Sequence, residues 1–333
     1  ADERILSWSD DKTLRLWDGQ SGALIATLLG HRSAVKGARV LSDGRILSWA
    51  WDKTLRLWDG KSGIPLGTLE GYNHSVEGVL ELSDGRILTW SFLDKTLCLW
   101  NEQSGNPFTI IGEHSEQING ALELSSGRIL SWSDDKTLRL WDEQSGALLA
   151  TLEGHSDSIN GALELKNGRI LSWSADDTLR LWDGQSGAFI NTLKGHTCGV
   201  RGALELSDGH ILSWSSDHTL RLWREQNATP LACLEAHTCP VAGALEQSDG
   251  CILSWDSDNT LYLWDRLSDA PLTTFEFHPD QTKGTLELSD GRILTWSDVN
   301  TLSIWDQQSG ALIATLKGHH QPVKGALELS DGR

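Results

Sequence analysis

The chain has 333 residues and a formal net charge of −18, from 46 acidic and 28 basic side chains. This excess of negative charge disfavours non-specific binding to nucleic acid or to an anionic membrane. No apolar run approaches the roughly 18 residues that a membrane-spanning helix needs.

The cysteine pattern favours a reducing environment. The five cysteines are odd in number and include no Cys-x-x-Cys pair, so a cytoplasmic setting fits better than a disulfide framework. His196-Thr197-Cys198 and His237-Thr238-Cys239 contain metal-binding residue types, but their histidines have a structural explanation given below, and we expect no metal and no cofactor. Because the chain contains no methionine, we expect it to be part of a larger polypeptide.

Tryptophan recurs with a fixed period, and a fixed period decides the architecture. Sixteen of the seventeen tryptophans form two series with steps of 41 residues, apart from one step of 42 in each series. The first Trp series is Trp8, Trp49, Trp90, Trp132, Trp173, Trp214, Trp255 and Trp296. The second Trp series is Trp17, Trp58, Trp100, Trp141, Trp182, Trp223, Trp264 and Trp305. The chain therefore holds eight copies of one unit.

Each unit is expected to form four short strands. In the copy at 35–69 the expected strands are 35–41, 45–49, 54–58 and 64–69. Asp43-Gly44 is a hairpin signal between the first two strands. Four strands with apolar faces are not stable alone, but copies stacked radially cover one another's faces. The sequence predicts an all-β, eight-bladed β-propeller with four antiparallel strands per blade.

The two ends of the chain are expected to share the last blade. Residues 323–329 repeat the first strand of the unit, and residues 4–28 repeat the other three. Pairing of 323–329 with Arg4–Ser9 would complete the blade begun by 4–28. Residues 1–333 then form a single propeller domain, expected to be a monomeric ring because closure removes open edges.

The repeat resembles the WD-repeat β-propeller family over essentially the whole chain. Gly30-His31, Ser48, Asp52 and Trp58-Asp59 stand where that family places its motifs. The resemblance implies a structural hydrogen-bonded tetrad of His31, Ser48, Asp52 and Trp58, repeated as His155, Ser172, Asp176 and Trp182. The near-identical copies are similar to recently amplified bacterial members of the family. The resemblance also implies a protein-interaction scaffold.

Catalytic chemistry is not expected. Ser, His and Asp recur in copy after copy beside a Trp, whereas a catalytic triad occurs once and needs an accessible nucleophile. The glutamates of the recurring Ala-Leu-Glu-Leu segments recur in the same way, and we expect them to pair with the arginines of Gly-Arg-Ile-Leu across the hairpin. The protein is therefore predicted not to be an enzyme.

Function is expected where the copies differ. Trp51 is the one tryptophan outside both series, the next copy has Phe92 and Leu93 in a turn longer by one residue, and Tyr72 replaces the tetrad His there. Exposed apolar side chains rimmed by polar ones indicate a partner site. The alternative is that drifted copies simply repacked their turns.

A second departure is electrostatic. Lys36, Lys283 and Lys324 follow the first-strand Val or its equivalent in three consecutive copies around the closed ring. They predict a basic arc beside the copy that carries Trp51, with a solvated rim as the alternative. Together with the apolar cluster, the arc predicts a protein or peptide partner that has an acidic segment and an apolar anchor.

The sequence therefore predicts a non-catalytic interaction scaffold or sensor module that docks its partner on the loop face of the ring. The alternative is multivalent binding of a small ligand or glycan in equivalent pockets between blades. An enzyme with its site in the central channel would need a unique cluster of ionisable groups, and none stands out in the sequence.

Overall fold

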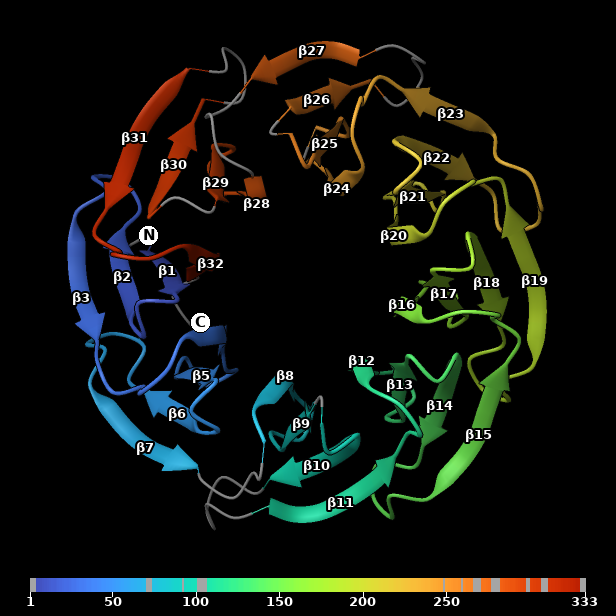
Figure 1. The fold of residues 1–333 in the computed structure, drawn as a ribbon, viewed down its shortest axis with the longest axis horizontal. Coiled ribbons are helices and arrows are strands. Elements are labelled where there is room, and N and C mark those ends of the chain that lie inside the picture. Colours follow the sequence, from blue (N-terminus) through green and yellow to red (C-terminus); the bar gives the residue numbers. More distant parts are fainter. Residues whose placement is uncertain are drawn as a thin grey trace. The chain divides into compact units, whose positions relative to one another are not determined.

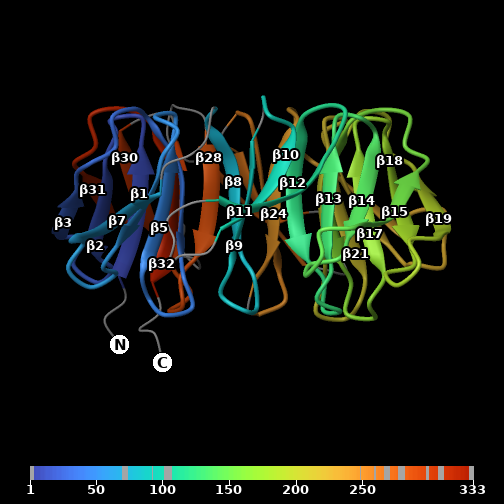
Figure 2. The ribbon, with the colours of Figure 1, turned by 90° about the horizontal axis from the view of Figure 1, so that it is seen from below.

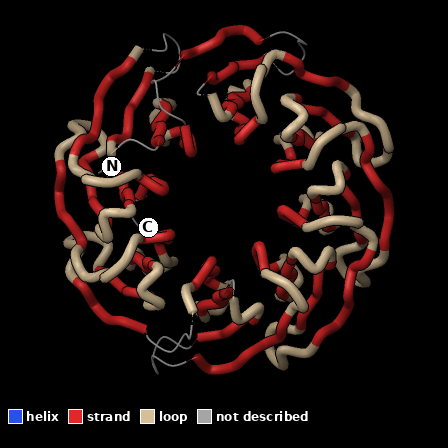
Figure 3. The backbone as a smooth tube through the Cα atoms, viewed as in Figure 1, coloured by secondary structure: helices blue, strands red, loops and turns tan. Residues whose placement is uncertain are grey.

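The computed structural model describes residues 4–69, 74–91, 93–100, 107–247, 249–258, 260–265, 271–276, 282–297, 300–306 and 311–329. In this part of the chain, all regular secondary structure is β, in 32 strands that form eight four-stranded antiparallel sheets (Figures 1 and 3). The predicted fold class, an eight-bladed β-propeller, is confirmed. Contacts between Cα atoms divide the chain into two compact units, which are described separately.

The first unit comprises residues 1–89, 100–108 and 278–333. Its complete blades are β28 (Thr282–Glu287), β29 (Ile293–Ser297), β30 (Thr301–Trp305) and β31 (Leu312–Lys317); β32 (Val323–Leu329), β1 (Arg4–Ser9), β2 (Leu14–Asp18) and β3 (Leu24–Leu28); and β4 (Val35–Val40), β5 (Ile46–Ala50), β6 (Leu55–Trp58) and β7 (Pro65–Leu69). A further sheet contains β8 (Val76–Glu81), β9 (Ile87–Ser91), β10 (Thr96–Trp100) and β11 (Pro107–Glu113).

The second unit comprises residues 90–99 and 109–277. Its four complete blades are β12 (Ile118–Glu123), β13 (Ile129–Ser133), β14 (Thr137–Trp141) and β15 (Leu148–Glu153); β16 (Ile159–Glu164), β17 (Ile170–Ser174), β18 (Thr178–Trp182) and β19 (Phe189–Lys194); β20 (Val200–Glu205), β21 (Ile211–Ser215), β22 (Thr219–Trp223) and β23 (Ala232–Glu235); and β24 (Val241–Glu246), β25 (Ile252–Asp256), β26 (Thr260–Trp264) and β27 (Pro271–Glu276). Within this unit the first strands lie side by side on the concave side, and the fourth strands lie outermost (Figure 1).

The closing blade, β32 with β1–β3, joins the two ends of the chain as predicted. β1 pairs antiparallel with β32, from Arg4 opposite Leu329 to Ser9 opposite Val323. The two strands lie side by side in both views (Figures 1 and 2). Ile5 and Leu6 on β1, and Val323 on β32, have no exposed side-chain surface. The non-local strand therefore adds apolar burial as well as backbone hydrogen bonds.

Antiparallel strands place the turns of each blade on two opposite faces. In the blade β16–β19, one face carries the loop that contains His155 and the turn that contains Asp176; we call this the His face. The opposite face carries the turn between the first and second strands and the turn between the third and fourth. In Figure 2, β13, β14, β17 and β18 run between these two faces of the second unit.

Trp182 and the other members of the second Trp series fill the space between blades. Each is at most 8% exposed. Trp223, for example, is fully buried among Leu165, Leu171 and Leu179 of the preceding blade. A buried tryptophan removes roughly 200 Å² from water, so each blade covers a large apolar surface on its neighbour.

The first Trp series explains a recurring glycine. Gly161 on β16 lies opposite Trp173 on β17, next to a β-bulge at Ile159. A Cβ atom at Gly161 would lie 2.2 Å from Cζ2 of Trp173. The indole therefore lies directly against the glycine backbone, and only glycine leaves room for it. Gly37, Gly120, Gly202, Gly243, Gly284 and Gly325 have the same relation to the tryptophan of their own blade.

The recurring glutamates link neighbouring blades, so the predicted pairing across the hairpin is wrong for Glu164, Glu205 and Glu328. Glu164 accepts hydrogen bonds from the backbone N (2.6 Å) and Oγ (2.7 Å) of Ser125, in the turn of the preceding blade. Glu81, Glu205 and Glu328 accept from the equivalent turns. Glu164 stands at the end of the first strand of its blade, beside the first turn of the preceding blade. The backbone N–H groups of that turn have no partner within the turn and donate to the carboxylate.

The outermost strands carry a feature that the sequence analysis missed. In six blades the strand that pairs with the third strand contains a β-bulge, and the extra residue is an exposed Leu or Ile. These bulge residues are Ile25, Leu66, Leu149, Ile190, Leu272 and Ile313. Bulges twist an edge strand and make it a poorer template for pairing with another chain.

A search of the described residues finds no helix that is long and apolar enough to span a membrane.

Candidate functional site

The predicted tetrad forms in the blade β16–β19. Nε1 of Trp182 donates a hydrogen bond to Oγ of Ser172 (2.9 Å). Nε2 of His155 lies 2.9 Å from the same hydroxyl, and its Nδ1 lies 2.9 Å from Oδ2 of Asp176. These distances fit one arrangement, in which Ser172 donates to Nε2 and the Nδ1–H of a neutral histidine donates to the carboxylate. The chain of hydrogen bonds joins β17, β18, the turn between them and the loop that enters the blade.

Four more blades have the same tetrad in the described part of the chain, including the predicted one of His31, Ser48, Asp52 and Trp58. In that blade, Nε2 of His31 lies 2.8 Å from Oγ of Ser48, and Nε1 of Trp58 donates to the same oxygen at 2.8 Å. The other three are His319–Ser7–Asp11–Trp17, His114–Ser131–Asp135–Trp141 and His196–Ser213–Asp217–Trp223.

The blade β24–β27 forms a variant that the sequence analysis did not predict. Nδ1 of His237 lies 2.9 Å from Oδ2 of Asp256, which stands at the end of β25 where the neighbouring blades have serine. Asp258, at the usual turn position, instead accepts a hydrogen bond from the Cys239 thiol at 2.8 Å. Asp256 is fully buried, so its carboxylate is the closer partner for the buried imidazole.

Hydrogen bonding, and not exposure, keeps the tetrad aspartates ionised. Burial alone would raise the pKa of Asp176. Hydrogen bonds from His155 and Thr178 lower the pKa by more than burial raises it, so it lies well below its usual range. The pKa values of Asp11, Asp52, Asp135 and Asp217 are lowered by the same balance of burial and hydrogen bonding. Burial also lowers the pKa of His31, despite its aspartate partner.

These shifts predict loss of stability in acid. An aspartate with a depressed pKa in the folded state contributes stability above its unfolded pKa of about 3.9, and loses that contribution as the pH falls toward its folded pKa. Because the lowered pKa of His31 favours its neutral form in the folded protein, we expect the free energy of unfolding to begin a gentle fall below about pH 6.5. Protonation of the aspartates should make the fall steep below about pH 4. Urea unfolding at a series of pH values measures this dependence.

A double variant, Asp135→Asn/Asp176→Asn, should be less stable at pH 7. Its free energy of unfolding should also fall less steeply below pH 4, because two of the carboxylates that take up protons in this range have been removed. An unchanged acid slope in that variant would contradict the assignment.

The Ser–His–Asp groups are not arranged as a nucleophilic site. Ser172 has no exposed surface, and its oxygen already accepts the indole N–H of Trp182. The remaining hydroxyl proton points to His155, but no solvent-accessible space meets the oxygen. The geometry supports a structural role for this group in each of the five repeated tetrads.

Trp51 lies on the His face of the blade β4–β7 and is 55% exposed. The ammonium of Lys36 lies 3.9 Å from the centroid of its ring. The same ammonium forms an ion pair with Glu77 of the following blade, and the Lys36 side chain is only 11% exposed. Lys36 therefore links two neighbouring blades beneath an exposed indole, and its ammonium in the predicted basic arc is already paired with a carboxylate.

The other predicted docking residues are only partly described. Lys324 forms an ion pair with Asp10, with 3.0 Å between Nζ and Oδ2. Leu93 is exposed but belongs to the second unit. Tyr72, Phe92 and the side chain of Lys283 lie outside the described residues. The structure thus brings Lys36 and Trp51 into contact.

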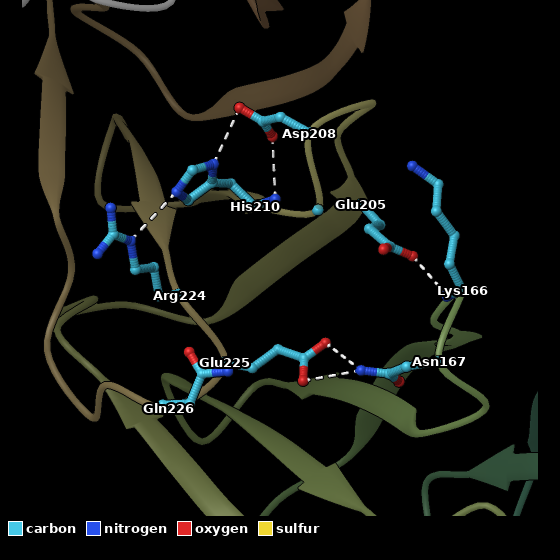
Figure 4. Close-up of a pocket in the computed structure, with 9 residues that line it drawn as sticks. Lys166, Asn167, Glu205, Asp208, His210, Arg224, Glu225 and Gln226 are labelled. Atoms are coloured by element: carbon cyan, nitrogen blue, oxygen red, sulfur yellow. Dashed lines mark hydrogen bonds and ion pairs between the residues drawn. The ribbon is translucent and has the colours of Figure 1, made fainter.

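A cavity of about 510 Å³ on the opposite face of the second unit was missed. It lies between the blades β16–β19 and β20–β23 (Figure 4). Two of its lining residues break the repeat: Arg224 stands where Asp18, Asp59, Asp142 and Asp183 stand in other copies, and His210 replaces a recurring arginine. Both departures are visible in the sequence, on the face opposite the predicted docking face.

Three segments of the chain, 22–59, 146–183 and 187–224, match the family model described as "WD domain, G-beta repeat". Each matched segment contains one of the complete tetrads described above. The chain contains WD40 repeats. The predicted resemblance is confirmed by these segments and by the fold. WD40 propellers generally serve as scaffolds for protein–protein interaction and are generally non-catalytic.

Solved structures share the fold over most of the chain. The crystal structure of the computationally designed Ika8 protein is similar with a TM-score of 0.80 and 23% sequence identity, over 92% of this chain and 93% of that chain. The WD40 β-propeller domain of Doa1 is similar with a TM-score of 0.63 and 25% identity, over 86% of this chain and 97% of that chain. Among curated proteins, no sequence matches this chain.

Proposed function

We propose that residues 1–333 act as one non-catalytic WD40 propeller that docks a protein or peptide on the His face, with Trp51 as the main anchor. The single observation that carries this proposal is the exposed indole of Trp51 held against Lys36. A cation above an aromatic ring contributes about 0.5–1 kcal/mol at an exposed site. The contact limits the motion of the indole before binding, which lowers the entropy cost of docking.

The chemistry around Trp51 supports a partner that has an acidic residue beside an apolar anchor. The side chains of Arg32 and Lys53 are exposed, and both flank the turn: the backbone N of Arg32 donates to Oδ2 of Asp52, and Lys53 follows Asp52 in the chain. Trp and Arg are enriched among the residues that dominate interfaces. Cations here also oppose the overall charge of −18, so an acidic segment would be directed toward this turn.

Tyr72, Phe92, Leu93, Lys283 and Lys324 remain proposed contributors to the same surface on the basis of the sequence. The ion pair of Lys324 with Asp10 means that an acidic partner would have to compete with an existing carboxylate there. We therefore place the largest binding contribution at Trp51 and a smaller one at the lysines.

The test is selection of binders from a displayed library of random peptides, followed by measured dissociation constants. We expect selected peptides to be enriched in acidic residues next to an aromatic or large aliphatic residue. Trp51→Ala should weaken their binding at least tenfold, as truncation of a central anchor does. Lys36→Glu should also weaken binding, because it places like charges together and removes the cation from the indole.

Leu149→Ala is the matched control, since Leu149 is a similarly exposed apolar residue on an outer strand. It should leave the dissociation constants unchanged. Equal binding by the wild type and by Trp51→Ala would contradict the proposed face, and failure to select any binder would contradict a peptide-docking function.

The second candidate is binding of a small ligand or glycan at several equivalent sites between blades. It predicts a stoichiometry well above one, whereas docking at Trp51 predicts one bound peptide per chain. Calorimetric titration separates the two.

A further inference from the structure

Two neighbouring outer strands of the second unit expose apolar side chains in pairs. On β15 these are Leu148 and Leu149, and on β19 they are Phe189 and Ile190, each between 40% and 53% exposed. Leu149 and Ile190 are the bulge residues of their strands. We call these four residues the rim patch. Exposed apolar residues in a group, unlike single ones, indicate an interaction surface.

The two halves of the rim patch belong to one surface. The turn that precedes β19 packs against β15, since a Cβ atom at Gly187 would lie 3.0 Å from Cδ1 of Leu152. The two strands follow one another along the outer side of this unit (Figure 1). Leu148 and Phe189 stand at the same level of their blades, because each pairs with the tryptophan that ends the third strand. Both apolar pairs therefore lie toward the face opposite the His face.

Phe189 is held in position before any partner binds. Its ring meets that of Trp182 edge-on, with 5.8 Å between the centroids. On its other contact, Cζ of Arg180 lies 5.6 Å from the centroid of the phenyl ring. The other bulged outer strands have leucine or proline at this position. A fixed aromatic side chain loses little conformational entropy on docking, so Phe189 is a suitable anchor.

The opposite end of each strand carries an exposed charge. Glu153 ends β15 and Lys194 ends β19, at equivalent positions of the repeat. Within the described part of the chain, neither side chain forms a hydrogen bond or an ion pair. The surface therefore combines two apolar pairs at one level with one carboxylate and one ammonium at another. Such a surface is complementary to itself.

We propose that the rim patch binds the rim patch of a second copy of this chain, in a dimer with twofold symmetry. The axis runs between β15 and β19, in the direction from one face to the other. It places β15 of each copy against β19 of the partner subunit, so that the apolar pairs meet each other. Glu153 then meets Lys194 of the partner subunit, and the symmetry makes this contact twice. An axis at right angles to this direction would instead set the charges against the apolar side chains.

The bulges explain why the contact is made by side chains. At Leu149 and Ile190 they interrupt the regular edge of the sheet, which disfavours pairing with a strand of another chain. The contact is small, because four apolar side chains per copy cover less than the roughly 800 Å² per partner of a standard interface. The net charge of −18 on each copy also opposes association. We therefore expect a weak dimer in equilibrium with the monomeric ring, with a dissociation constant on the order of 100 µM.

The test is sedimentation equilibrium of the full chain at concentrations from about 5 to about 500 µM, which bracket this dissociation constant. The average mass should rise from that of one chain toward that of two. Ile190→Glu should weaken association at least tenfold, because it places a charge in the apolar part of the contact. Ile25→Glu is the control, since it makes the same change at the bulge residue of β3 in the other unit. It should leave association unchanged.

Charge reversal tests the symmetry of the contact. Glu153→Lys alone and Lys194→Glu alone should each weaken association, because like charges then meet across the axis. An equal mixture of these two variants should associate as tightly as the wild type, since each variant carries the charge that the other lacks. This rescue requires β15 of one copy to lie against β19 of the other.

A protein that stays monomeric over the whole concentration range would leave the rim patch to a different partner and would overturn the proposal. Equal association of the wild type and Ile190→Glu would also overturn it, as would a mixture that associates no more tightly than the single variants. Circular dichroism confirms that each variant folds. None of these outcomes bears on peptide docking at Trp51, which lies in the other unit.

Discussion

Removal of β32 should cost the protein roughly 4–8 kcal/mol of its free energy of unfolding. Truncation after Pro322 deletes Val323, Ala326 and Leu329, which are buried against two apolar clusters. Full burial of an aliphatic side chain contributes about 1.5–3 kcal/mol, and the truncation also leaves β1 as an open edge. Urea unfolding followed by tryptophan fluorescence measures the difference.

A circular permutant provides the control. Residues 318–332 placed directly before residue 4 join β32 to β1 through Ser330-Asp331-Gly332, the turn that Ser42-Asp43-Gly44 forms in another copy. This variant keeps every strand and should retain close to wild-type stability. A truncated protein as stable as the wild type would contradict the role of the closing blade.

Substitution Ser172→Ala should destabilise the protein by about 2–4 kcal/mol. The hydroxyl is fully buried and has two partners, Nε1 of Trp182 and Nε2 of His155. Removing it leaves a buried donor and a buried acceptor unsatisfied, each at a cost of about 1–3 kcal/mol. Chemical denaturation of wild type and variant under identical conditions measures the loss.

The chain itself supplies two comparisons for this variant. Ser156→Ala changes an exposed serine in the same blade and should shift stability by less than about 0.5 kcal/mol. Ser172→Thr keeps the hydroxyl, as Thr89 and Thr295 do beside Trp100 and Trp305, and should recover much of the loss. A loss for Ser172→Ala no larger than that for Ser156→Ala would show that the tetrad contributes little.

Features that repeat along the chain were predictable. The Trp period of 41 residues gave the number of blades, and the Val35–Leu69 copy gave strands within a few residues of β4 to β7. The tetrads of His31 and His155 were also predicted, because each position in a repeated unit has the same neighbours. Repetition allows one copy to stand for the others.

Features that depend on a single copy's neighbours were not predictable in this way. Lys36 was predicted to contribute to a basic arc, but its position places it beside Glu77 of the next blade, where it forms an ion pair. Asp256 replaced the turn aspartate of its blade because a carboxylate at the strand end lies closer to His237. These contacts depend on how closely particular side chains approach one another in the folded protein. The repeat period gives no information about that distance.

The cavity marks a departure from the repeat on the face opposite Trp51. Arg224 breaks the repeat as clearly as Trp51 does, but it lies in the turn between the third and fourth strands, on the face opposite the predicted docking face. The exposed Leu and Ile at the outer bulges were missed for another reason. Side chains along a strand normally alternate between its two faces. The extra residue of each bulge interrupts this alternation, so the exposed positions cannot be read from the sequence pattern.

Hydrogen exchange of the protein with and without a selected peptide tests the docking claim most directly. The account predicts slower exchange on binding at residues 32–36 and 50–54, around Trp51, with little change at 148–153 or 205–210. Slower exchange confined to the outer strands or to the turns of the opposite face, with none around Trp51, would contradict the proposed docking face.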